Sequence, residues 1–440
     1  MARKYFVETF GCQMNVHDSE RIAGLLEQDG FEPAADESSA DLVVINTCSV
    51  REKAEEKLYA RLGDLKRAAP STTIAVTGCV AQQEGARILE RAPHVDVIAG
   101  TQRVKALPEL VREARARHTP RVDVNAHDDV SFPLGIARRH DPVRAFVTII
   151  EGCNDYCAFC VVPYTRGHER MRPAADILGE VREAAESGRV EVQLLGQIVN
   201  HYRAPDDPSC DFAGLLERVS NVNGIERIRF ASPHPRHVTP RLVDAIRDLP
   251  KVCKHLHLPV QSGSNRILAA MRRRHTREQY LDQVAALRNA VPDIDLSTDV
   301  IVGFPGETDD DFEQTLDLTR AARYHSMFSF KYSVRPNTLA SKRLSDDVPE
   351  AEKTRRIMAL QALQRDLQYE LYQARIGSMQ DVLVDTIAPG GELGGRTRGN
   401  MVVNFSGPRQ WLGRFVAVRI SGATPYQLRG EAVVPAEASC

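Results

Sequence analysis

Residues 145–160 read AFVTIIEGCNDYCAFC, an apolar run followed at once by three cysteines. The run Ala145–Ile150 has the length and composition of a buried β-strand. Cys153, Cys157 and Cys160 follow it with the spacing C-x3-C-x2-C. Three thiolates can hold a [4Fe–4S] cluster and leave one iron without a protein ligand, so that this iron can bind an outside molecule.

The same order of strand and helix recurs through residues 145–373. Further strands are expected at Glu191–Leu195, Arg227–Ala231, His255–Pro259, Leu296–Val302 and Met327–Tyr332. Helices are expected between and after them at Ala174–Ser187, Pro240–Arg247, Arg277–Asn289, Asp309–Ala322 and Pro349–Gln373. Six β/α units predict an incomplete parallel (β/α)6 barrel, whose chemistry should lie at the carboxyl ends of the strands, where Cys153 stands.

A second set of three cysteines lies upstream, in residues 1–118. Strands are expected there at Tyr5–Phe10, Leu42–Asn46, Thr73–Thr77 and Asp96–Ala99, and helices at Ser19–Gln28, Arg51–Arg67, Gln82–Arg91 and Val104–Arg115. This alternation predicts a parallel sheet with crossover helices. Cys12, Cys48 and Cys79 each come just after one of the first three strands, at the sheet edge where ligands bind. We therefore expect them to meet in space; the alternative is three scattered buried cysteines.

Two other segments differ in character. Residues 119–144 contain several prolines and no clear period, which indicates a linker. Residues 374–437 predict a small antiparallel β-barrel, with short β-type runs at Asp381–Ile387, Asn400–Phe405, Phe415–Ile420 and Gly430–Val434. The expected fold class is α/β: a parallel-sheet domain, a central partial barrel over 145–373 and a small C-terminal barrel.

The composition narrows the class of protein. The 440 residues are 42% hydrophobic and 26% charged, as in soluble globular proteins, and the net charge of −2 argues against wholesale wrapping of nucleic acid. No apolar run approaches the length of about 20 residues that crosses a bilayer, and no signal-peptide core is seen, so a cytoplasmic protein is expected. Disulfides are not expected among its nine cysteines. Cys210, Cys253 and Cys440 are interpreted as incidental thiols.

A structural zinc site is the alternative for the C-x3-C-x2-C loop. Zinc needs four tetrahedral ligands, so a fourth would have to come from a distant residue such as His168 or Cys210. The aromatic residue between the last two cysteines would have no role in such a site. The spacing therefore favours the cluster over zinc.

The free iron of such a cluster can chelate the amino and carboxylate groups of S-adenosylmethionine. The cofactor would be held at neighbouring strand ends, where glycines allow close approach of the backbone. The candidate contacts are Phe159, Gly196, Gln197, Gln261, Ser262, Val302 and Gly303. The alternative for each loop is an ordinary strand-to-helix turn with Gly and Ser caps.

Several longer motifs resemble the radical S-adenosylmethionine methylthiotransferases, and the resemblance covers nearly the whole chain. The motifs are Glu8–Asn15, Asn46–Arg51, Thr77–Cys79, Glu151–Gly167, His257–Gly263 and Ser297–Thr308. The C-terminal module resembles a TRAM domain, an RNA-binding module in this family. Ile198, Val334 and Asn337 depart from the residues usual in the family, which concerns the cofactor pocket and the last barrel loop but not the cysteines.

This resemblance implies two [4Fe–4S] clusters, one for each set of cysteines, and two S-adenosylmethionine molecules per turnover. The first molecule would methylate a sulfur on the upstream cluster, and the second would supply a 5′-deoxyadenosyl radical that takes hydrogen from C2 of an adenine. The methylthio group would then pass to that carbon. The resemblance also implies an electron donor such as a flavodoxin or ferredoxin, a sulfur source, and a monomer.

Two short motifs narrow the choice of the molecule that would accept the methylthio group. Gly11–Asn15 and Asn154–Tyr156 favour the branch of the family that acts on N6-dimethylallyladenosine at position 37 of tRNA, with the anticodon stem-loop as partner. Methylthiolation of threonylcarbamoyl-adenosine or of a ribosomal-protein aspartate is the alternative. A non-catalytic iron–sulfur protein that binds RNA or carries electrons is the alternative from another class.

Basic residues that could contact RNA phosphates lie in two places. The barrel has Arg266, Arg272, Arg273, Arg274, His275 and Arg277, and the C-terminal module has Arg396, Arg398, Arg409, Arg414 and Arg429. A solvated surface is the alternative for both groups. Trp411 and Phe405 could stack on bases, but packing of the small barrel is favoured for both.

Overall fold

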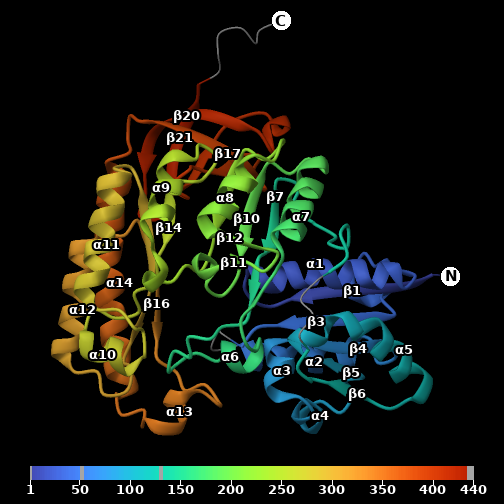
Figure 1. Cartoon of the computed structure of the whole chain (residues 1–440). Helices are drawn as coiled ribbons and strands as arrows, with labels where there is room; N and C mark the ends of the chain where they lie inside the picture. Colours follow the sequence, from blue (N-terminus) through green and yellow to red (C-terminus); the bar gives the residue numbers. More distant parts are fainter. Residues whose placement is uncertain (1, 50–53, 128–131, 434–440) are drawn as a thin grey trace, which may run out of the picture.

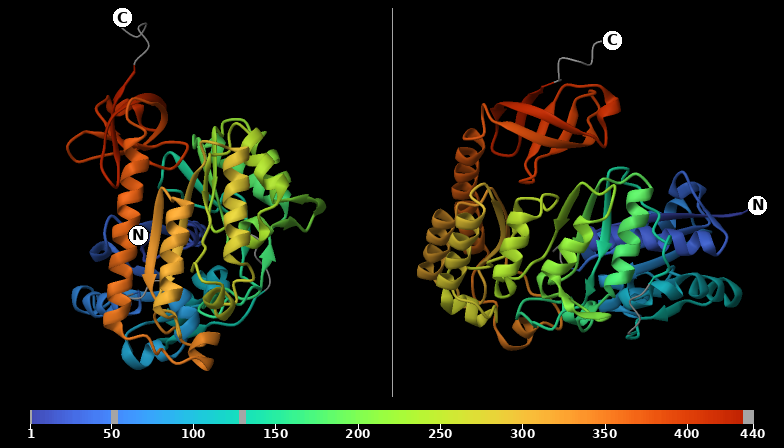
Figure 2. Two further views of the ribbon diagram at one scale, coloured as in Figure 1. Left: turned by 90° about the vertical axis from the view of Figure 1, so that its left-hand side faces the viewer. Right: turned by 45° about the horizontal axis from the view of Figure 1, so that its top comes forward.

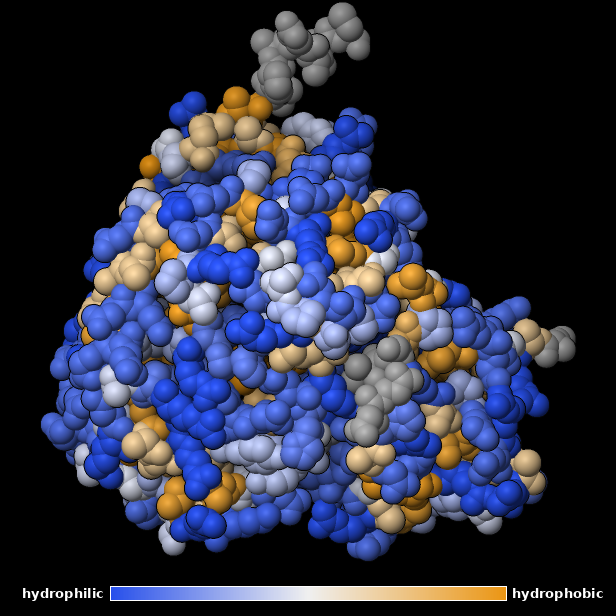
Figure 3. Space-filling model, viewed as in Figure 1, coloured by the Kyte–Doolittle hydropathy of each residue, from blue (hydrophilic) through white to orange (hydrophobic). Residues whose placement is uncertain are grey.

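The structure, a computed structural model, describes residues 2–49, 54–127 and 132–433. Figure 1 shows three parts: an N-terminal α/β domain, a central barrel beside it, and a small β-barrel at the C-terminal end. This α/β architecture confirms the fold class predicted from the sequence. No helix within the described ranges is long and apolar enough to cross a membrane, and the face in Figure 3 is mostly hydrophilic with small separate apolar patches.

The N-terminal domain is built on six parallel strands in the order β2-β1-β3-β4-β5-β6. The strands are β1 (Arg3–Thr9), β2 (Phe31–Pro33), β3 (Leu42–Thr47), β4 (Thr73–Gly78), β5 (Val97–Ala99) and β6 (Arg121–Asp123). Helices α1 (Gln13–Gln28) and α5 (Leu107–Arg117) cover one face, and α2 (Ala54–Ala68), α3 (Cys79–Glu84) and α4 (Arg87–Arg91) cover the other. The first four residues of strand β3 are apolar because Leu42 and Val44 pack on one face of the sheet while Val43 and Ile45 pack on the other.

Several boundaries in this domain differ from the sequence prediction. Helix α1 begins at Gln13 rather than Ser19, because its first turns bury polar side chains such as Asn15 and His17 and so lack an apolar stripe. The helix predicted over Gln82–Arg91 is two helices that meet at Gly85, whose φ is +52°. The start of the helix predicted over Arg51–Arg67 lies outside the described residues.

Two short strands were missed by the sequence prediction. Both β2 and β6 have three residues and lie at the edges of the sheet, so they carry little periodicity. Strand β6 pairs in parallel with β5 and lies within the segment interpreted as a linker. The sheet of the N-terminal domain therefore continues to Asp123.

The central barrel contains all six predicted parallel strands. They are β7 (Arg144–Thr148), β10 (Glu191–Leu195), β13 (Arg227–Phe230), β14 (His255–His257), β15 (Asp295–Val302) and β16 (Ser326–Lys331). The three-stranded sheets β7-β10-β13 and β14-β15-β16 are joined by a parallel bridge between Ile228 and Val252. Among the described strands none pairs β16 with β7, so the barrel is open, as predicted.

Helices cover the outside of this barrel (Figure 1). They are α7 (Ala174–Glu186), α8 (Phe212–Ser220), α9 (Pro240–Asp248), α10 (Asn265–Ala270), α11 (Arg277–Ala290) and α12 (Asp309–Ala322). Short elements after the strands were not predicted: α6 (Val162–Thr165), α13 (Leu339–Arg343), the pair β8 (Ile150–Glu151) and β9 (Arg170–Met171), and the pair β11 (Arg203–Ala204) and β12 (Asp207–Asp211). One continuous apolar core lies between strands and helices.

Helix α14 (Glu350–Gln373) packs along β16 and leads into the C-terminal barrel, as both views in Figure 2 show. That barrel is closed in the order β17-β18-β19-β21-β20. Its strands are β17 (Met379–Ile387), β18 (Leu393–Arg396), β19 (Val402–Phe405), β20 (Phe415–Ala423) and β21 (Leu428–Ala432), of which β18 was not predicted. Arg227 of the central barrel donates to the carbonyl of Arg396 and to the carboxylate of Asp381, which attaches the two barrels.

Candidate functional site

The upstream cysteines follow three neighbouring strands of the N-terminal sheet. Cys12 caps the start of α1 after β1, Cys48 follows β3, and Cys79 is the first residue of α3 after β4. Strands β1, β3 and β4 are adjacent in the sheet, so their carboxyl ends lie together. A methyl group added at Gly11 would come within 2.7 Å of the Cβ of Cys48, which shows how closely the first two loops approach.

The thiols of this set lie in different environments. A hydrogen bond with Cys48 is the main reason why the pKa of Cys12 is lowered, to about 5. Burial raises the pKa of Cys79, and the guanidinium of Arg166 opposes that rise. A thiolate at Cys12 is the form that ligates iron.

Arg166 brings a positive charge from the central barrel to the upstream cysteines. Its guanidinium is buried and donates to the carboxylate of Asp18 on α1 over 2.7 Å. Burial alone lowers the pKa of Arg166, but Asp18 and the thiols of Cys79 and Cys12 more than offset that effect, so the net pKa is raised. A retained cation beside three thiolates reduces the electrostatic cost of gathering them.

The second set of cysteines lies in the loop between β8 and α6. The amide of Cys153 donates to the carbonyl of Gly167 over 3.1 Å, and the amide of Cys160 donates to the carbonyl of Cys157 over 3.0 Å. Gly152 has a φ of +80°, and a Cβ there would lie 2.0 Å from the carbonyl oxygen of His168. The loop is therefore closely packed against the segment that follows it.

Burial dominates the electrostatics of this loop. It raises the pKa of Cys153 to about 11 and that of Cys160 to about 12. The guanidinium of Arg273, itself buried, donates to the sulfur of Cys157 over 3.5 Å. Buried thiols ionise readily only beside compensating positive charge, and cluster iron would supply that charge.

The sulfurs do not surround a single point. Among the described residues, no three Cys, His, Asp or Glu side chains are close enough together to hold one metal ion. The four irons of a cubane sit at separate corners, so its cysteines need not converge as the ligands of a single ion do. The donor set of each site, three cysteines and no other acidic or imidazole ligand, fits a cluster with one free iron.

A cavity of about 400 Å³ joins the two cysteine sites. It reaches from Ser49, next to Cys48, to Cys160 at the end of the second loop. Its other walls come from the ends of β14–β16, the segment after Cys160 and α14: Phe159, Val161, Val162, Gln261, Asp299, Ile301, Ser329, Phe330, Lys331, Tyr332, Ser333, Arg335 and Ile357. A molecule in this cavity would touch Cys160 on one side and Ser49, the neighbour of Cys48, on the other.

Of the residues predicted to contact S-adenosylmethionine, Phe159 and Gln261 line this cavity. Gln261 has a φ of +76°, and its backbone pairs with β15, which fixes its position at the strand end. Gln197 lies at the domain interface, where its amide donates to the sulfur of Met14, and its Oε1 is buried without a hydrogen-bond partner in the described structure. Gly196 has a packing role as well, because a Cβ there would lie 2.1 Å from the side chain of Ile150.

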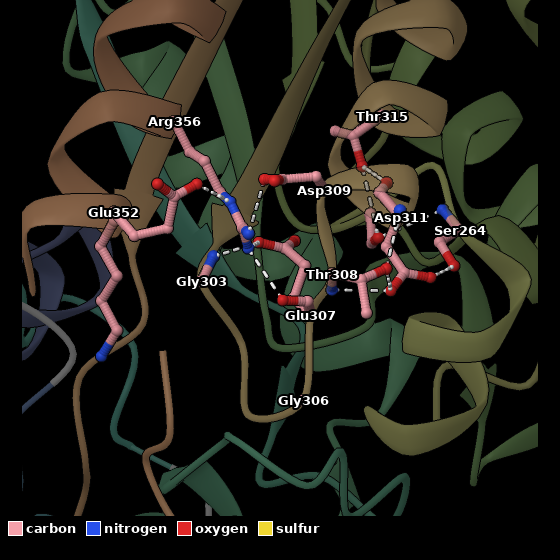
Figure 4. A network of polar contacts seen from close by, with 12 residues as sticks. Ser264, Gly303, Gly306, Glu307, Thr308, Asp309, Asp311, Thr315, Glu352 and Arg356 are labelled. Atoms are coloured by element: carbon pink, nitrogen blue, oxygen red, sulfur yellow. Dashed lines mark hydrogen bonds and ion pairs between the residues drawn. The ribbon is translucent and has the colours of Figure 1, made fainter. Parts of the chain in front are cut away.

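Ser262, Val302 and Gly303 do not line this cavity, and the side chains of Ser262 and Val302 are buried. The amide of Gly303 donates to the carboxylate of Glu307 over 2.6 Å, and Arg356 of α14 donates to the same carboxylate over 2.8 Å. Figure 4 shows this network, which continues to Thr308, Asp309, Asp311, Ser264 and Glu352. Its place in the structure is to fix the loop after β15 against α14.

Several residues of the site were missed by the sequence prediction. Asp299 and Tyr332 line the cavity, while Arg166 and Arg273 reach the two sets of cysteines from other loops. A signal in the sequence existed only for Asp299, a charged residue in the middle of the expected strand Leu296–Val302.

Some of the basic residues predicted to contact RNA are exposed in the structure, and others are buried or hydrogen-bonded to the protein. Arg409, Arg414 and Arg429 are exposed on the C-terminal barrel. Arg273 is buried at the loop of Cys157, and Arg398 donates to the main-chain carbonyls of Pro250 and Val252 in the central barrel. Phe405 is buried in the core of the small barrel and Trp411 lies near it with ring centroids 6.5 Å apart, so packing, as favoured, is the role of both.

Comparison with known proteins identifies all three parts. A family model described as the radical SAM superfamily matches residues 147–319, a TRAM domain model matches 373–433, and a model described as uncharacterized protein family UPF0004 matches 4–100. Among solved structures, the radical S-adenosylmethionine methyltransferase TsrM from Kitasatospora setae superposes with a TM-score of 0.57 at 14% identity, over 87% of this chain and 81% of that one. The cobalamin-dependent S-adenosylmethionine radical enzyme OxsB gives 0.53 at 13%, over 83% and 56%. At these identities the likeness shows the fold alone.

The curated relatives are far more similar. A protein of Pseudomonas paraeruginosa is 48% identical over 440 residues, and one of Solibacter usitatus is 45% identical over 435, with 98% of both chains covered in each case. Both are named tRNA-2-methylthio-N(6)-dimethylallyladenosine synthase. Membership of the radical SAM superfamily implies a [4Fe–4S] cluster and S-adenosylmethionine, and the matched residues include the loop from Cys153 to Cys160. The chain belongs to the tRNA-2-methylthio-N(6)-dimethylallyladenosine synthase family of radical S-adenosylmethionine enzymes.

Proposed function

We propose that this protein transfers a methylthio group to C2 of N6-dimethylallyladenosine at position 37 of tRNA, beside the anticodon. The single observation that carries the proposal is the cavity of about 400 Å³ that reaches from the loop of Cys48 to Cys160. Sulfur delivery and radical formation need separate sites, and a shared cavity lets one adenine meet both. The names of the relatives supply the acceptor.

Cys153, Cys157 and Cys160 would hold the cluster that cleaves S-adenosylmethionine, and that cluster, when bound, supplies one electron to the sulfonium. Phe159 and Gln261 would then contact the cofactor from the cavity wall. Ile301, Phe330 and Tyr332 form an apolar wall of the cavity, which would limit the access of water to a reactive intermediate once the substrate is bound.

Cys12, Cys48 and Cys79 would hold a second [4Fe–4S] cluster that carries the sulfur. Two S-adenosylmethionine molecules would be used per turnover, one as the methyl source and one as the radical source. Arg166 would stabilise the anionic sulfur site from the barrel side, since its guanidinium interacts with two of the three thiols. A protein electron carrier and an external sulfur source would complete the reaction.

The tRNA would bind through the small barrel and place its anticodon loop at the cavity. Exposed Arg409, Arg414 and Arg429 offer contacts to phosphates. A single-stranded loop makes it inexpensive to extrude one adenine from its stack, because no base pair is broken. Such a reaction fits a cytoplasmic monomer.

The test uses anaerobically reconstituted protein, dithionite, S-adenosylmethionine and tRNA that carries N6-dimethylallyladenosine, with nucleosides analysed by mass spectrometry. The unaltered chain should contain about eight irons and form the 2-methylthio nucleoside. Cys48→Ser should lose about half of the iron and all of the product while still releasing 5′-deoxyadenosine. Cys253→Ser, a buried thiol of the barrel, is the matched control and should retain product.

Two outcomes would refute the proposal. Product found only on threonylcarbamoyl-adenosine or on a ribosomal-protein aspartate would change the acceptor. Release of no 5′-deoxyadenosine by fully loaded protein would indicate an electron carrier or an RNA-binding iron–sulfur protein instead.

A further inference from the structure

The cysteine loop of the barrel has two sides. Its second half, Phe159–Val162, lines the cavity. Its first half lies against basic side chains. The carboxylate of Asp155 forms ion pairs with the guanidinium groups of Arg236, at 3.1 Å, and Arg274, at 3.7 Å. The amide of Asp155 in turn donates to the sulfur of Cys153 over 3.5 Å. Asp155 therefore connects the arginines outside the loop to Cys153, one of the proposed cluster ligands.

The turn after α10 presents three consecutive arginines to this side of the loop. Arg272 and Arg274 have φ values of +58° and +55°, a left-handed conformation that is costly for residues other than glycine. The conformation points the middle residue, Arg273, inward, where it donates to the sulfur of Cys157 and to the carbonyl of Pro259. Arg272 and Arg274 on either side of it are exposed.

Three exposed arginines beside the loop, Arg236, Arg272 and Arg274, carry positive charge that acidic side chains of the protein balance only in part. Arg272 has no side-chain hydrogen bond or ion pair to any described residue. Arg236 and Arg274 share a single carboxylate, that of Asp155. The nearby ring of His234 adds no charge, because burial lowers its pKa far below neutrality. The surface of Arg236, Arg272 and Arg274, called the basic turn below, is thus net positive.

We propose that the basic turn is the docking surface for a small acidic protein that carries single electrons to the cluster of the barrel. This rests on the proposed function, which consumes an electron at that cluster. One electron leaves the reduced carrier and enters the oxidised cluster, and no bond forms or breaks. The carrier is chosen by charge: an acidic patch complements the basic turn, and such complementarity raises the rate of encounter.

The two-sided loop explains why a carrier rather than RNA is assigned to this surface. The adenine must enter the cavity on the Phe159–Val162 side, so the tRNA occupies that side during turnover. An electron needs only proximity to the cluster, and the Cys153–Asp155 side provides it while the cavity is full. The contact of Arg273 with Cys157 also brings the basic turn directly to a ligand of the cluster.

The test uses the full chain with its clusters reconstituted, and measures 5′-deoxyadenosine with either dithionite or reduced flavodoxin as the electron source. Arg272→Glu is the informative variant, because that side chain makes no hydrogen bond or ion pair to any described residue. Arg182→Glu on the exposed face of α7 is the matched control for the change in charge. Binding of tRNA is measured for both variants.

For Arg272→Glu we expect the KM for flavodoxin at low salt to rise about tenfold and to depend less on ionic strength. The rate with dithionite and the affinity for tRNA should stay within twofold of the unaltered protein, and Arg182→Glu should change none of these. An unchanged KM for flavodoxin would overturn the inference. So would weaker tRNA binding alone, which would assign the basic turn to phosphates, or an equal loss with both reductants, which would assign it to cluster assembly. Absence of 5′-deoxyadenosine from unaltered protein with dithionite would instead overturn the proposed function.

Discussion

Glu180 of α7 is the node of a buried ionic network between the N-terminal domain and the barrel. Its carboxylate accepts from Arg172 over 2.7 Å and from Arg139 over 3.1 Å, and lies 2.9 Å from the ring of His17 on α1. Arg21 of α1 lies 3.9 Å from it. Three guanidinium groups therefore approach one carboxylate in an interior where the side chain of Glu180 is only 8% exposed. Arg139 also pairs with Glu183 and Arg21 with Glu151.

We predict that Glu180→Gln, which keeps the size of the side chain, lowers the stability of the two-domain unit by about 3–5 kcal/mol, the usual cost of removing one member of a buried ion pair. The amide can still accept one hydrogen bond, but its NH2 group would face a second donor. Burial alone raises the pKa of Glu180, and Arg172, His17 and Arg21 more than offset it, so the pKa is well below normal and the carboxylate is charged at neutral pH.

The assay is thermal unfolding of anaerobically reconstituted protein at pH 7.5. A loss of this size lowers the Tm by on the order of 10 °C for domains of this length. Glu183→Gln, one turn further along the same helix, is the matched control, because that carboxylate pairs with Arg139 but is 31% exposed. Its loss should cost less than about 1 kcal/mol.

The same substitution should separate the two partial reactions. Helix α1 directly follows Cys12 and carries His17 and Arg21, so the network around Glu180 holds one cysteine site in register with the other. Glu180→Gln should reduce formation of the methylthio product more than release of 5′-deoxyadenosine. Equal Tm values for Glu180→Gln and Glu183→Gln, or equal losses of both products, would refute this reasoning.

Three further predictions follow from buried groups. Burial and the charge of Arg21 lower the pKa of His17 to about 4, from about 6.5 in the unfolded chain, so the contribution of His17 to folding stability is complete above pH 6.5 and is lost as the pH falls toward 4. The difference in unfolding free energy between the unaltered protein and His17→Gln should therefore shrink by about 1 kcal/mol from pH 7.5 to 5.5. A difference that stays constant over this range would contradict the prediction. Arg356→Gln should lower the Tm far more than Arg355→Gln, because only Arg356 pairs with a buried carboxylate, and equal shifts would exclude that pairing as the cause. Phe405 is buried, so Phe405→Ala should lower the unfolding free energy of the C-terminal barrel by about 3–5 kcal/mol. The variant should lose tRNA binding in a filter assay while it still releases 5′-deoxyadenosine. Retained tRNA binding would argue against the proposed role of that barrel.

The strand-end rule allowed much of the site to be predicted. In a parallel sheet the carboxyl ends of neighbouring strands share an edge, so residues as distant as Cys12, Cys48 and Cys79 could be placed together from the strand pattern. The six barrel strands could be predicted because short runs with apolar positions alternate along the chain with helical stretches. Short edge strands such as β2 and β6 gave no comparable signal.

What could not be predicted are contacts that exist only after the domains meet. Helix α1 buries polar residues, so its first turns look solvent-exposed in the sequence although they form the domain interface. Arg166 and Arg273 look like ordinary surface arginines, yet each is buried beside a set of cysteines. Ser262 and Gly303 could be placed by the strand-end rule, but their hydrogen bonds with Thr315 and Glu307 could not be predicted from the sequence.

The segment after Cys160 explains how two sites on separate domains keep a fixed spacing. Thr101 donates to the carbonyl of Thr165, and the next residue, Arg166, both accepts from Gln102 and pairs with Asp18. Gly167 then returns to the cysteine loop, where its carbonyl accepts from the amide of Cys153. Three consecutive residues thus bind the N-terminal domain on one side and the cluster loop on the other. Their polar contacts, rather than the chain that links the domains, set the distance across which an adenine must meet both sites.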